Sequence, residues 1–240
     1  MINTLPLITI ITVVYNGFDT IENTVVDVLN QTYKNIEYII IDGGSTDGTV
    51  DVIKKYQNQI SYWISEPDNG IYDAMNKGWA KANKDSYIIF LGSGDKIICL
   101  PNMDLYKDVD VVFGDVSLGE HRIFKSTIGW RSYFGNTIHH QAMLVKKRLN
   151  MEPPFSLEYK IYSDFDFNQR LLKKGVNFQK DDNFHGFALE GGVSEQLDIK
   201  EVVKIVKKNH GYFMSKLALL YFELQKINGI RKNNSSSSTL

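Results

Sequence analysis

The amino-acid sequence predicts an α/β fold in which helices flank a mostly parallel β-sheet. In the first 95 residues, short apolar runs rich in Ile and Val alternate with segments of helical spacing. This alternation is typical of βαβ units, whose strands are parallel and buried on both faces. Polar residues and glycines follow each apolar run directly, which marks the end of a strand. The second half of the chain is less regular and ends in a helical segment.

Apolar runs predict the strands of the parallel sheet at residues 7–14, 38–41, 60–64 and 87–91. Helices are expected between these strands. Asp19 and Glu22 have the spacing of a capping box for the first helix, and Ser45 or Thr46 can begin the second. The third helix is expected over residues 72–82.

The second half predicts a strand pair at residues 109–116 and 122–125, a further strand at 141–145 and a helix at 163–174. Gly175 follows that helix in the position of a C-terminal cap. Apolar groups and Lys recur at helical spacing over residues 200–227, and the four serines of residues 233–240 suggest a disordered tail.

We therefore divide the chain into a first half (residues 1–98), a second half of the same domain (99–199), a basic helical region (200–232) and a tail (233–240). The net charge of −1 gives no sign of general nucleic-acid binding. The basic region has a local charge of about +6, which suggests peripheral contact with a membrane. A solvated helix packed on the domain explains the same pattern.

Cellular location is predicted from what the sequence lacks. Cys99 is the one cysteine, so the chain forms no internal disulfide and no zinc site built from thiolates. We find no secretory signal and no apolar run of the roughly 20 residues that a membrane span needs. We expect a cytoplasmic protein, with any membrane contact at the inner face.

The polar residues after the four predicted strands are expected to share one crevice, because ligands of such sheets bind outside the carboxyl ends of the strands. These residues are Tyr15 and Asn16, Asp42, the turn at 66–70 and the turn at 92–95. Asp95 follows Gly92-Ser93-Gly94 and is suited to bind Mg²⁺ or Mn²⁺ together with a diphosphate. A turn capped by an aspartate is an equally good interpretation of Asp95.

Other candidates also have two interpretations each. Asp42, with Gly43 and Ser45, suits a base or ribose but also suits a Gly-rich turn, and the segment lacks the Lys of a Walker loop. Asp68 and Asn76 flank a helix start suited to phosphate or sugar, although Asp68 can simply be a cap.

In the second half, Asp164 and Asp166 begin a helix, where a carboxylate can serve as general base or stabilise the helix dipole. His140 and Gln141 precede a strand, and Gly192 lies in a flexible turn that could close over a ligand.

Taken together, these segments resemble family 2 glycosyltransferases, which have the GT-A fold. The resemblance runs from about residue 7 to residue 194 and is strongest over residues 8–95. Its motifs include Thr12-Val13-Val14-Tyr15-Asn16, Asp42-Gly43-Gly44-Ser45, Asp68-Asn69-Gly70 and Gly92-Ser93-Gly94-Asp95. This resemblance implies an enzyme that uses a nucleotide-diphosphate sugar, with a UDP-sugar favoured.

The resemblance also implies roles. The donor would be bound by Thr12, Tyr15, Asn16, Asp42, Gly43, Ser45, Asp68, Asn76, Ser93 and Gly94. Asp95 would bind the metal, and Asp164 would be the base of an inverting transfer in cell-surface polysaccharide biosynthesis. His140, Gln141 and Gly192 would face a saccharide or lipid-linked acceptor.

The sequence departs from the family pattern at two places. Gly92-Ser93-Gly94-Asp95 has one carboxylate where the family motif Asp-x-Asp has two, and Ser163 stands where many relatives have Glu. Asp166 therefore competes with Asp164 for the role of base. A non-catalytic subunit that binds nucleotide sugars is the alternative function. A sugar-1-phosphate nucleotidyltransferase fits less well, because no cation follows the first strand.

Overall fold

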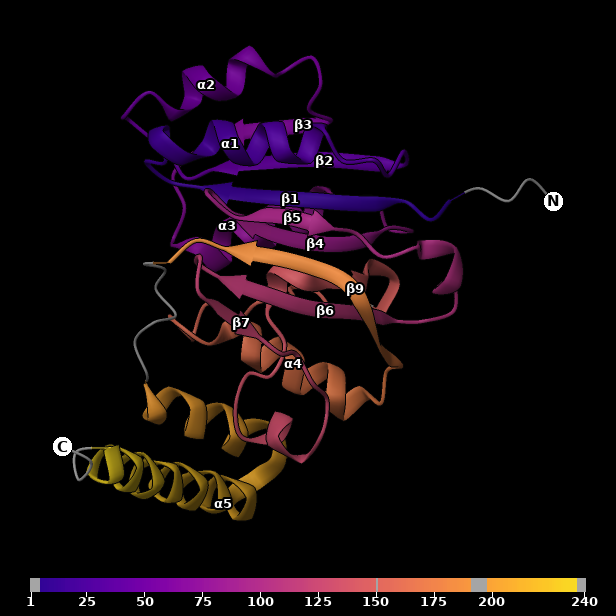
Figure 1. Cartoon of the computed structure of the whole chain (residues 1–240). Coiled ribbons are helices and arrows are strands. Elements are labelled where there is room, and N and C mark those ends of the chain that lie inside the picture. The colour runs from indigo at the N-terminus through magenta and orange to yellow at the C-terminus, as the bar shows by residue number, and fades with distance from the viewer. Residues whose placement is uncertain (1–4, 150, 191–197, 237–240) are drawn as a thin grey trace.

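The structure is a computed structural model that describes residues 5–149, 151–190 and 198–236. A nine-stranded sheet runs through the molecule in the order β3-β2-β1-β4-β8-β6-β9-β5, with β7 paired to β6 (Figure 1). Both halves of the chain contribute strands to this one sheet. The α/β fold expected from the sequence is confirmed.

The first four strands are parallel, as predicted. They are β1 (Ile8–Val14), β2 (Ile36–Asp42), β3 (Tyr62–Ser65) and β4 (Tyr87–Gly92). Every residue of β1 is buried, which is the reason that its sequence is mostly apolar and consists of β-branched residues.

Antiparallel pairing enters with the second half. Its strands are β5 (Lys96–Cys99), β6 (Val111–Leu118), β7 (Arg122–Phe124), β8 (Met143–Lys146) and β9 (Phe178–Ala188). Strand β8 lies antiparallel between β4 and β6, while β6 and β9 are parallel. The expected β6–β7 pair is confirmed.

Strand β9 was not predicted, although it is the longest strand. Its centre is polar, with Lys180, Asp181, Asp182 and Asn183 in succession. Asp181 accepts backbone hydrogen bonds from Asn183 and Phe184, and the register with β6 shifts between Phe113 and Asp115. This irregularity removes the alternation of apolar and polar residues by which a strand is recognised.

The helices are α1 (Phe18–Leu29), α2 (Thr49–Lys55), α3 (Ile71–Lys81), α4 (Ser163–Lys174) and α5 (Ile199–Ser236). Short 3-10 turns lie at η1 (Met103–Leu105), η2 (Trp130–Tyr133), η3 (His140–Ala142) and η4 (Lys147–Leu149). The bounds predicted for α4 are confirmed, and Gly175 caps it with a left-handed backbone.

Two predicted helix starts are wrong. The N-cap of α1 is Gly17, without a side-chain cap, and Glu22 instead accepts a hydrogen bond from the Tyr56 hydroxyl. Helix α2 begins at Thr49 and not near Ser45, because the preceding loop is held against the end of β1.

Two apolar cores cover the two faces of the sheet. Helices α1 and α2 pack on one face through side chains such as Ile21, Val25 and Ile53. Helices α3 and α4 pack on the other through Trp79, Phe167 and other apolar groups. Layers of helix, sheet and helix therefore leave the carboxyl edge of the parallel strands open for a site.

Helix α5 lies at the far end of the molecule from α2 (Figure 1). It breaks at Gly211, whose φ of 86° lies outside the helical range. A third cluster joins both parts of α5 to α4, with Val202, Ile205 and Ala218 buried against Phe165. The helix runs to Ser236, so residues 233–236 are helical rather than part of the expected tail, and residues 237–240 lie outside the described ranges. Within the described ranges, no helix is long and apolar enough to span a membrane.

Candidate active site

The loops that follow β1 and β2 are interlocked by hydrogen bonds. The backbone N–H of Asn16 donates to Ser45 Oγ over 2.7 Å, and the N–H of Thr46 donates to Asn16 Oδ1 over 3.0 Å. Asn16 adopts a positive φ of 49°, which asparagine tolerates better than most residues. The predicted convergence of these two loops is confirmed.

Asp42 organises its own loop. It is fully buried, and its Oδ2 accepts hydrogen bonds from the backbone N–H groups of Gly44 and Ser45 and from the Ser65 hydroxyl. Its Oδ1 accepts from Ser45 Oγ. Both oxygens thus have partners inside the protein, but Oδ1 accepts a single hydrogen bond, so the roles of Asp42 and Ser45 as sugar-donor contacts stay predictions.

Tyr15, Gly43 and Asp68 meet at the mouth of this loop region. Tyr15 is 66% exposed, unusually high for an aromatic side chain beside a core. A Cβ atom added at Gly43 would lie 2.5 Å from Asp68 Oδ2 and 3.4 Å from Tyr15 Cβ. A side chain at Gly43 would displace the Asp68 carboxylate, and the three residues form one small surface with an aromatic wall and a carboxylate.

Asp95 lies at the end of β4 and is only 6% exposed. Its Oδ2 accepts from the Gly92 N–H (2.8 Å) and from Gln141 Nε2 (3.1 Å), and its Oδ1 accepts from the Leu189 N–H (3.0 Å). Burial raises the pKa of Asp95, an effect that the positive charge of His140 and these hydrogen bonds partly offset.

Ser93 and Gly94 shape the turn that presents Asp95. The Ser93 hydroxyl is 2.7 Å from Thr20 Oγ1, and the Gly94 N–H donates to Thr24 Oγ1. Gly94 has a φ of +98° and abuts Leu189, so a side chain would not fit. The Ser93 hydroxyl and the Gly94 N–H thus form hydrogen bonds with side chains of α1.

Two predicted sugar-donor contacts have hydrogen-bond partners within the protein. Thr12 is fully buried, and its hydroxyl lies 3.1 Å from the Tyr38 hydroxyl inside the core. Asn76 uses both ends of its amide on the backbone of Phe155, at 2.8 and 3.0 Å. These hydrogen bonds fix both side chains inside the protein, and the roles of Thr12 and Asn76 as sugar-donor contacts stay predictions.

Asp164 lies in the first turn of α4, in a polar pocket of its own. Its Oδ2 accepts from Asn136 Nδ2 at 2.7 Å and is 3.8 Å from His140 Nδ1. Its Oδ1 accepts from the Phe165 N–H and lies 3.4 Å from the Tyr72 hydroxyl. Burial acts to raise the pKa of Asp164, but the hydrogen bond and charge of His140 outweigh it and hold the pKa below its usual value.

Asp166 points elsewhere. It is 2% exposed, accepts from Arg170 Nε at 3.0 Å on Oδ2, and accepts from Asn209 Nδ2 at 2.9 Å on Oδ1. These partners join α4 to α5. Of the two carboxylates that competed for the base role, Asp166 is therefore engaged in helix packing.

The turn η3 lies between the two remaining carboxylates. Gln141 contacts Asp95, and its neighbour His140 faces Asp164. Gln141 Oε1 is buried without a hydrogen-bond partner, which leaves a polar atom for a ligand, while His140 Nδ1 lies 3.8 Å from Asp164 Oδ2. The predicted residue Gly192 lies outside the described residues.

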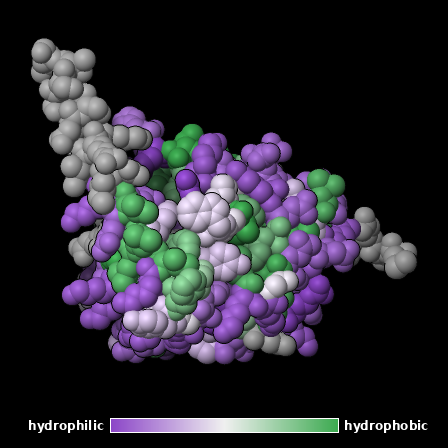
Figure 2. Space-filling view, turned by 90° about the horizontal axis from the view of Figure 1, so that it is seen from below, coloured by the Kyte–Doolittle hydropathy of each residue, from purple (hydrophilic) through white to green (hydrophobic). Residues whose placement is uncertain are grey.

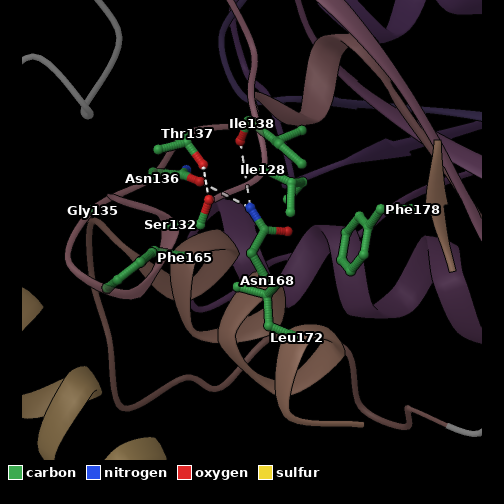
Figure 3. A pocket seen from close by; sticks show the side chains of 10 residues that line it. All are labelled: Ile128, Ser132, Gly135, Asn136, Thr137, Ile138, Phe165, Asn168, Leu172 and Phe178. Atoms are coloured by element: carbon green, nitrogen blue, oxygen red, sulfur yellow. Dashed lines mark hydrogen bonds between the residues drawn. The ribbon is translucent and has the colours of Figure 1, made fainter. Parts of the chain in front are cut away.

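Asn136 is held by a second amide. Asn168 Nδ2 donates to Asn136 Oδ1 at 2.8 Å, at the wall of a cavity that also includes Ser132 and Thr137 (Figure 3). The cavity measures about 10 Å³, so it holds at most one water molecule and no sugar.

Comparison with known proteins gives consistent results. The family described as Glycosyl transferase family 2 matches residues 9–95, which contain β1 to β4 and Asp95. Residues 9–95 are therefore similar to family 2 glycosyltransferases. It is 28% identical over 186 residues to the PGL/p-HBAD biosynthesis glycosyltransferase of Mycobacterium bovis, covering 70% of each chain. A putative teichuronic acid biosynthesis glycosyltransferase of Bacillus subtilis, TuaG, is 40% identical over 99 residues, which are 40% of this chain and 39% of that protein.

The chain matches only about a third of the length of other relatives. Against two uncharacterized glycosyltransferases of Mycobacterium tuberculosis, 44% identical over 92 residues, the match covers 38% of this chain and 35% of theirs.

Solved structures show that the fold is of the GT-A type. S. aureus TarS 1-349 in complex with UDP-GlcNAc superimposes with a TM-score of 0.64 at 18% identity, covering 85% of this chain and 66% of that one. The mannosyltransferase PcManGT from Pyrobaculum calidifontis, in complex with GDP-Man and Mn²⁺, gives 0.58 at 13% identity, covering 99% and 82%.

The residues around Asp95 fit a cation only if the donor supplies most of its ligands. Among the described residues, no group of three His, Cys, Asp or Glu side chains gathers as a metal site. Asp95 Oδ1 has one hydrogen-bond donor and so keeps a lone pair, and Gln141 Oε1 is an unpartnered oxygen beside it. Hard oxygens of this kind suit Mg²⁺ or Mn²⁺ when a diphosphate completes the shell.

Sequence reasoning missed several residues of the candidate site. Asn136, Tyr72 and the N–H of Leu189 contact the two carboxylates from loops or helices distant in the sequence. No local pattern marks them, because a single amide, hydroxyl or backbone group has no spacing signature.

Proposed function

We propose that this protein is an inverting glycosyltransferase that uses a nucleotide-diphosphate sugar. The observation that carries the proposal is the position of η3, in which adjacent residues contact two carboxylates with different surroundings, one buried and one partly buried. Gln141 donates to Asp95 at the end of β4, and His140 faces Asp164 at the start of α4. Asp95 suits the leaving group, and Asp164 suits the acceptor.

In this proposal Asp164 is the general base. Its lowered pKa keeps it ionised at neutral pH, and its hydrogen bonds to Asn136 and Phe165 fix its orientation. The Asp164 carboxylate takes the proton of an acceptor hydroxyl as that oxygen attacks the anomeric carbon. The bond from that carbon to the diphosphate oxygen breaks, and the nucleoside diphosphate leaves from the opposite face.

Asp95 and the side-chain oxygen Oε1 of Gln141 would hold a Mn²⁺ or Mg²⁺ ion that arrives with the sugar donor. A bound divalent ion supplies charge neutralisation for a leaving diphosphate. The Mn²⁺ in the GDP-Man complex of PcManGT supports this cofactor by analogy of fold.

Tyr15, Gly43 and Asp68 are the proposed base and ribose contacts. The exposed Tyr15 ring offers a stacking face, and Asp68 offers an acceptor for N–H or O–H groups. We favour UDP-sugars as donors, a choice supported by the UDP-GlcNAc bound to TarS.

The proposed acceptor is a saccharide or a lipid-linked saccharide in cell-surface polysaccharide biosynthesis. The names of the relatives, which concern PGL/p-HBAD and teichuronic acid biosynthesis, support this setting. A lipid-linked acceptor would place the protein at the inner face of the membrane.

The substitution Asp164→Asn tests the mechanism. Transfer from a UDP-sugar with Mn²⁺ should fall at least a hundredfold, because general bases typically contribute 10²- to 10⁴-fold. Donor binding, measured as a shift in the thermal unfolding midpoint, should persist because Asp164 does not touch the Tyr15 surface. Undiminished transfer by the variant contradicts the base assignment. Failure of the wild-type protein to transfer or hydrolyse any donor that it binds would favour the non-catalytic subunit.

A further inference from the structure

The two parts of α5 have different surroundings. Before Gly211, the buried side chains Val202, Ile205 and Val206 pack into the domain. Two lysines of this part, Lys204 and Lys208, form ion pairs with Glu158 at 2.8 and 3.1 Å. The first part of α5 is therefore a packed helix, and its charge is partly neutralised.

The second part, after Gly211, has an exposed apolar stripe. Phe213 is 74% exposed, Leu220 50% and Leu224 52%. These positions are separated by seven and four residues, so they lie on one side of the helix. We call Phe213, Leu220 and Leu224 the α5 stripe. Large apolar side chains that share one exposed helix side indicate an interaction surface rather than scattered surface residues.

The α5 stripe borders further exposed aromatic groups. Tyr221, on the adjoining side of the helix, contacts the ring of Trp130 at 5.8 Å between centroids, and Trp130 is itself 61% exposed. Figure 2 shows this face of the molecule, on which apolar side chains gather between polar ones. Trp and Tyr beside an aliphatic stripe are typical of the boundary between lipid headgroups and acyl chains.

Basic groups surround the same surface. The guanidinium of Arg131 lies 5.5 Å from the Trp130 ring. Lys207 and Lys216 lie 5.9 and 5.2 Å from the ring of Tyr212, which is 64% exposed. A rim of positive charge around an apolar stripe complements a layer of anionic headgroups above acyl chains. A second copy of this chain would instead bring like charges together.

We propose that the α5 stripe and Trp130 dock on an anionic membrane surface, with Arg131, Lys207 and Lys216 against the headgroups. The second part of α5 lies in the plane of the interface, while the first part attaches it to α4. This surface does not include the candidate active site, so membrane binding and glycosyl transfer can fail separately.

Vesicle sedimentation of the full chain tests the proposal. We expect the wild-type protein to bind vesicles of phosphatidylcholine with about 30% phosphatidylglycerol, to bind pure phosphatidylcholine much less, and to be released by 0.5 M NaCl. The double substitution Phe213→Ser with Leu220→Ser should reduce binding at least tenfold, because each apolar side chain contributes to partitioning.

A matched control removes exposed apolar groups elsewhere. Leu105 and Ile98 are 71% and 57% exposed and lie outside α5, so Leu105→Ser with Ile98→Ser should bind vesicles like the wild type. Thermal unfolding verifies that each variant is folded. Absence of wild-type binding to anionic vesicles, or equal binding by the Phe213 and Leu220 variant, overturns the proposal. The proposal is also overturned if sedimentation velocity shows that the wild-type protein is a dimer, and if the Phe213 and Leu220 variant is a monomer that still binds vesicles like the wild type.

Discussion

Gln141 Nε2 donates a hydrogen bond to Asp95 Oδ2 across 3.1 Å, and this bond joins the two halves of the domain at the candidate site. Asp95 belongs to the parallel half, just after β4, while Gln141 lies in the turn η3, which leads into β8. Gly186 of β9 closes this arrangement, because a Cβ there would lie 2.4 Å from the Gln141 carbonyl oxygen. The second half therefore positions the carboxylate that the first half provides.

We expect Gln141→Ala to lower kcat/KM for glycosyl transfer at least tenfold and to weaken Mn²⁺-dependent donor binding. The substitution removes a hydrogen bond to a buried carboxylate and the unpartnered oxygen beside it. It should also lower the free energy of unfolding by about 1–3 kcal/mol. Steady-state kinetics, donor titrations with and without Mn²⁺, and denaturant unfolding measure these effects. An unchanged Mn²⁺ dependence would remove Gln141 from the proposed cation site.

We expect Tyr15→Ala to weaken binding of the nucleoside diphosphate by about tenfold, since stacking on an aromatic ring is worth roughly 1–3 kcal/mol per base. Stability should change by less than about 0.5 kcal/mol, because the side chain is largely exposed. Tyr15→Phe is the control and should bind like the wild type. Isothermal titration with UDP measures the affinity, and equal affinity of the Ala variant would place the base elsewhere.

We expect Asp166→Ala to destabilise the fold by about 3 kcal/mol, because it leaves the Arg170 and Asn209 donors without their acceptor between α4 and α5. Transfer per folded molecule should remain within about threefold of wild type. Comparison with Asp164→Asn separates the two roles: Asp164 affects turnover and Asp166 affects unfolding. A large loss of turnover in folded Asp166→Ala would return Asp166 to the list of candidate bases.

The free energy of unfolding should fall as the pH decreases from about 6.5 to about 4. Burial lowers the pKa of His139 to about 4, while an unfolded histidine titrates near 6.5. Between these values the unfolded chain binds a proton that the folded protein does not, so stability rises with pH in this window. His139→Phe should keep the ring contact with Phe124, 4.3 Å between centroids, and flatten this dependence. Urea unfolding at pH 5 and pH 7 measures this pH dependence of stability. An equal change in the free energy of unfolding for the wild type and the His139→Phe variant would rule out His139 as the cause.

The sequence by itself determined the parallel half of the domain. Strands such as β1 are buried on both faces, so their apolar runs were visible without any tertiary information. The ends of these strands also located Tyr15, Asp68 and Asp95, because a parallel sheet brings its carboxyl ends to one edge.

Only the tertiary structure decided what each polar group is free to do. Thr12, Asn76 and Asp42 match family motifs, but their polar atoms are already engaged by Tyr38, Phe155 and the Asp42 loop. The same holds for Asp166, whose oxygens accept hydrogen bonds from Arg170 in α4 and Asn209 in α5. A hydrogen bond between distant residues depends on packing, and packing leaves no periodic signal in the sequence. For that reason the sequence predicted the edge of the sheet at which the candidate site lies, and the tertiary structure showed which side chains there already have partners.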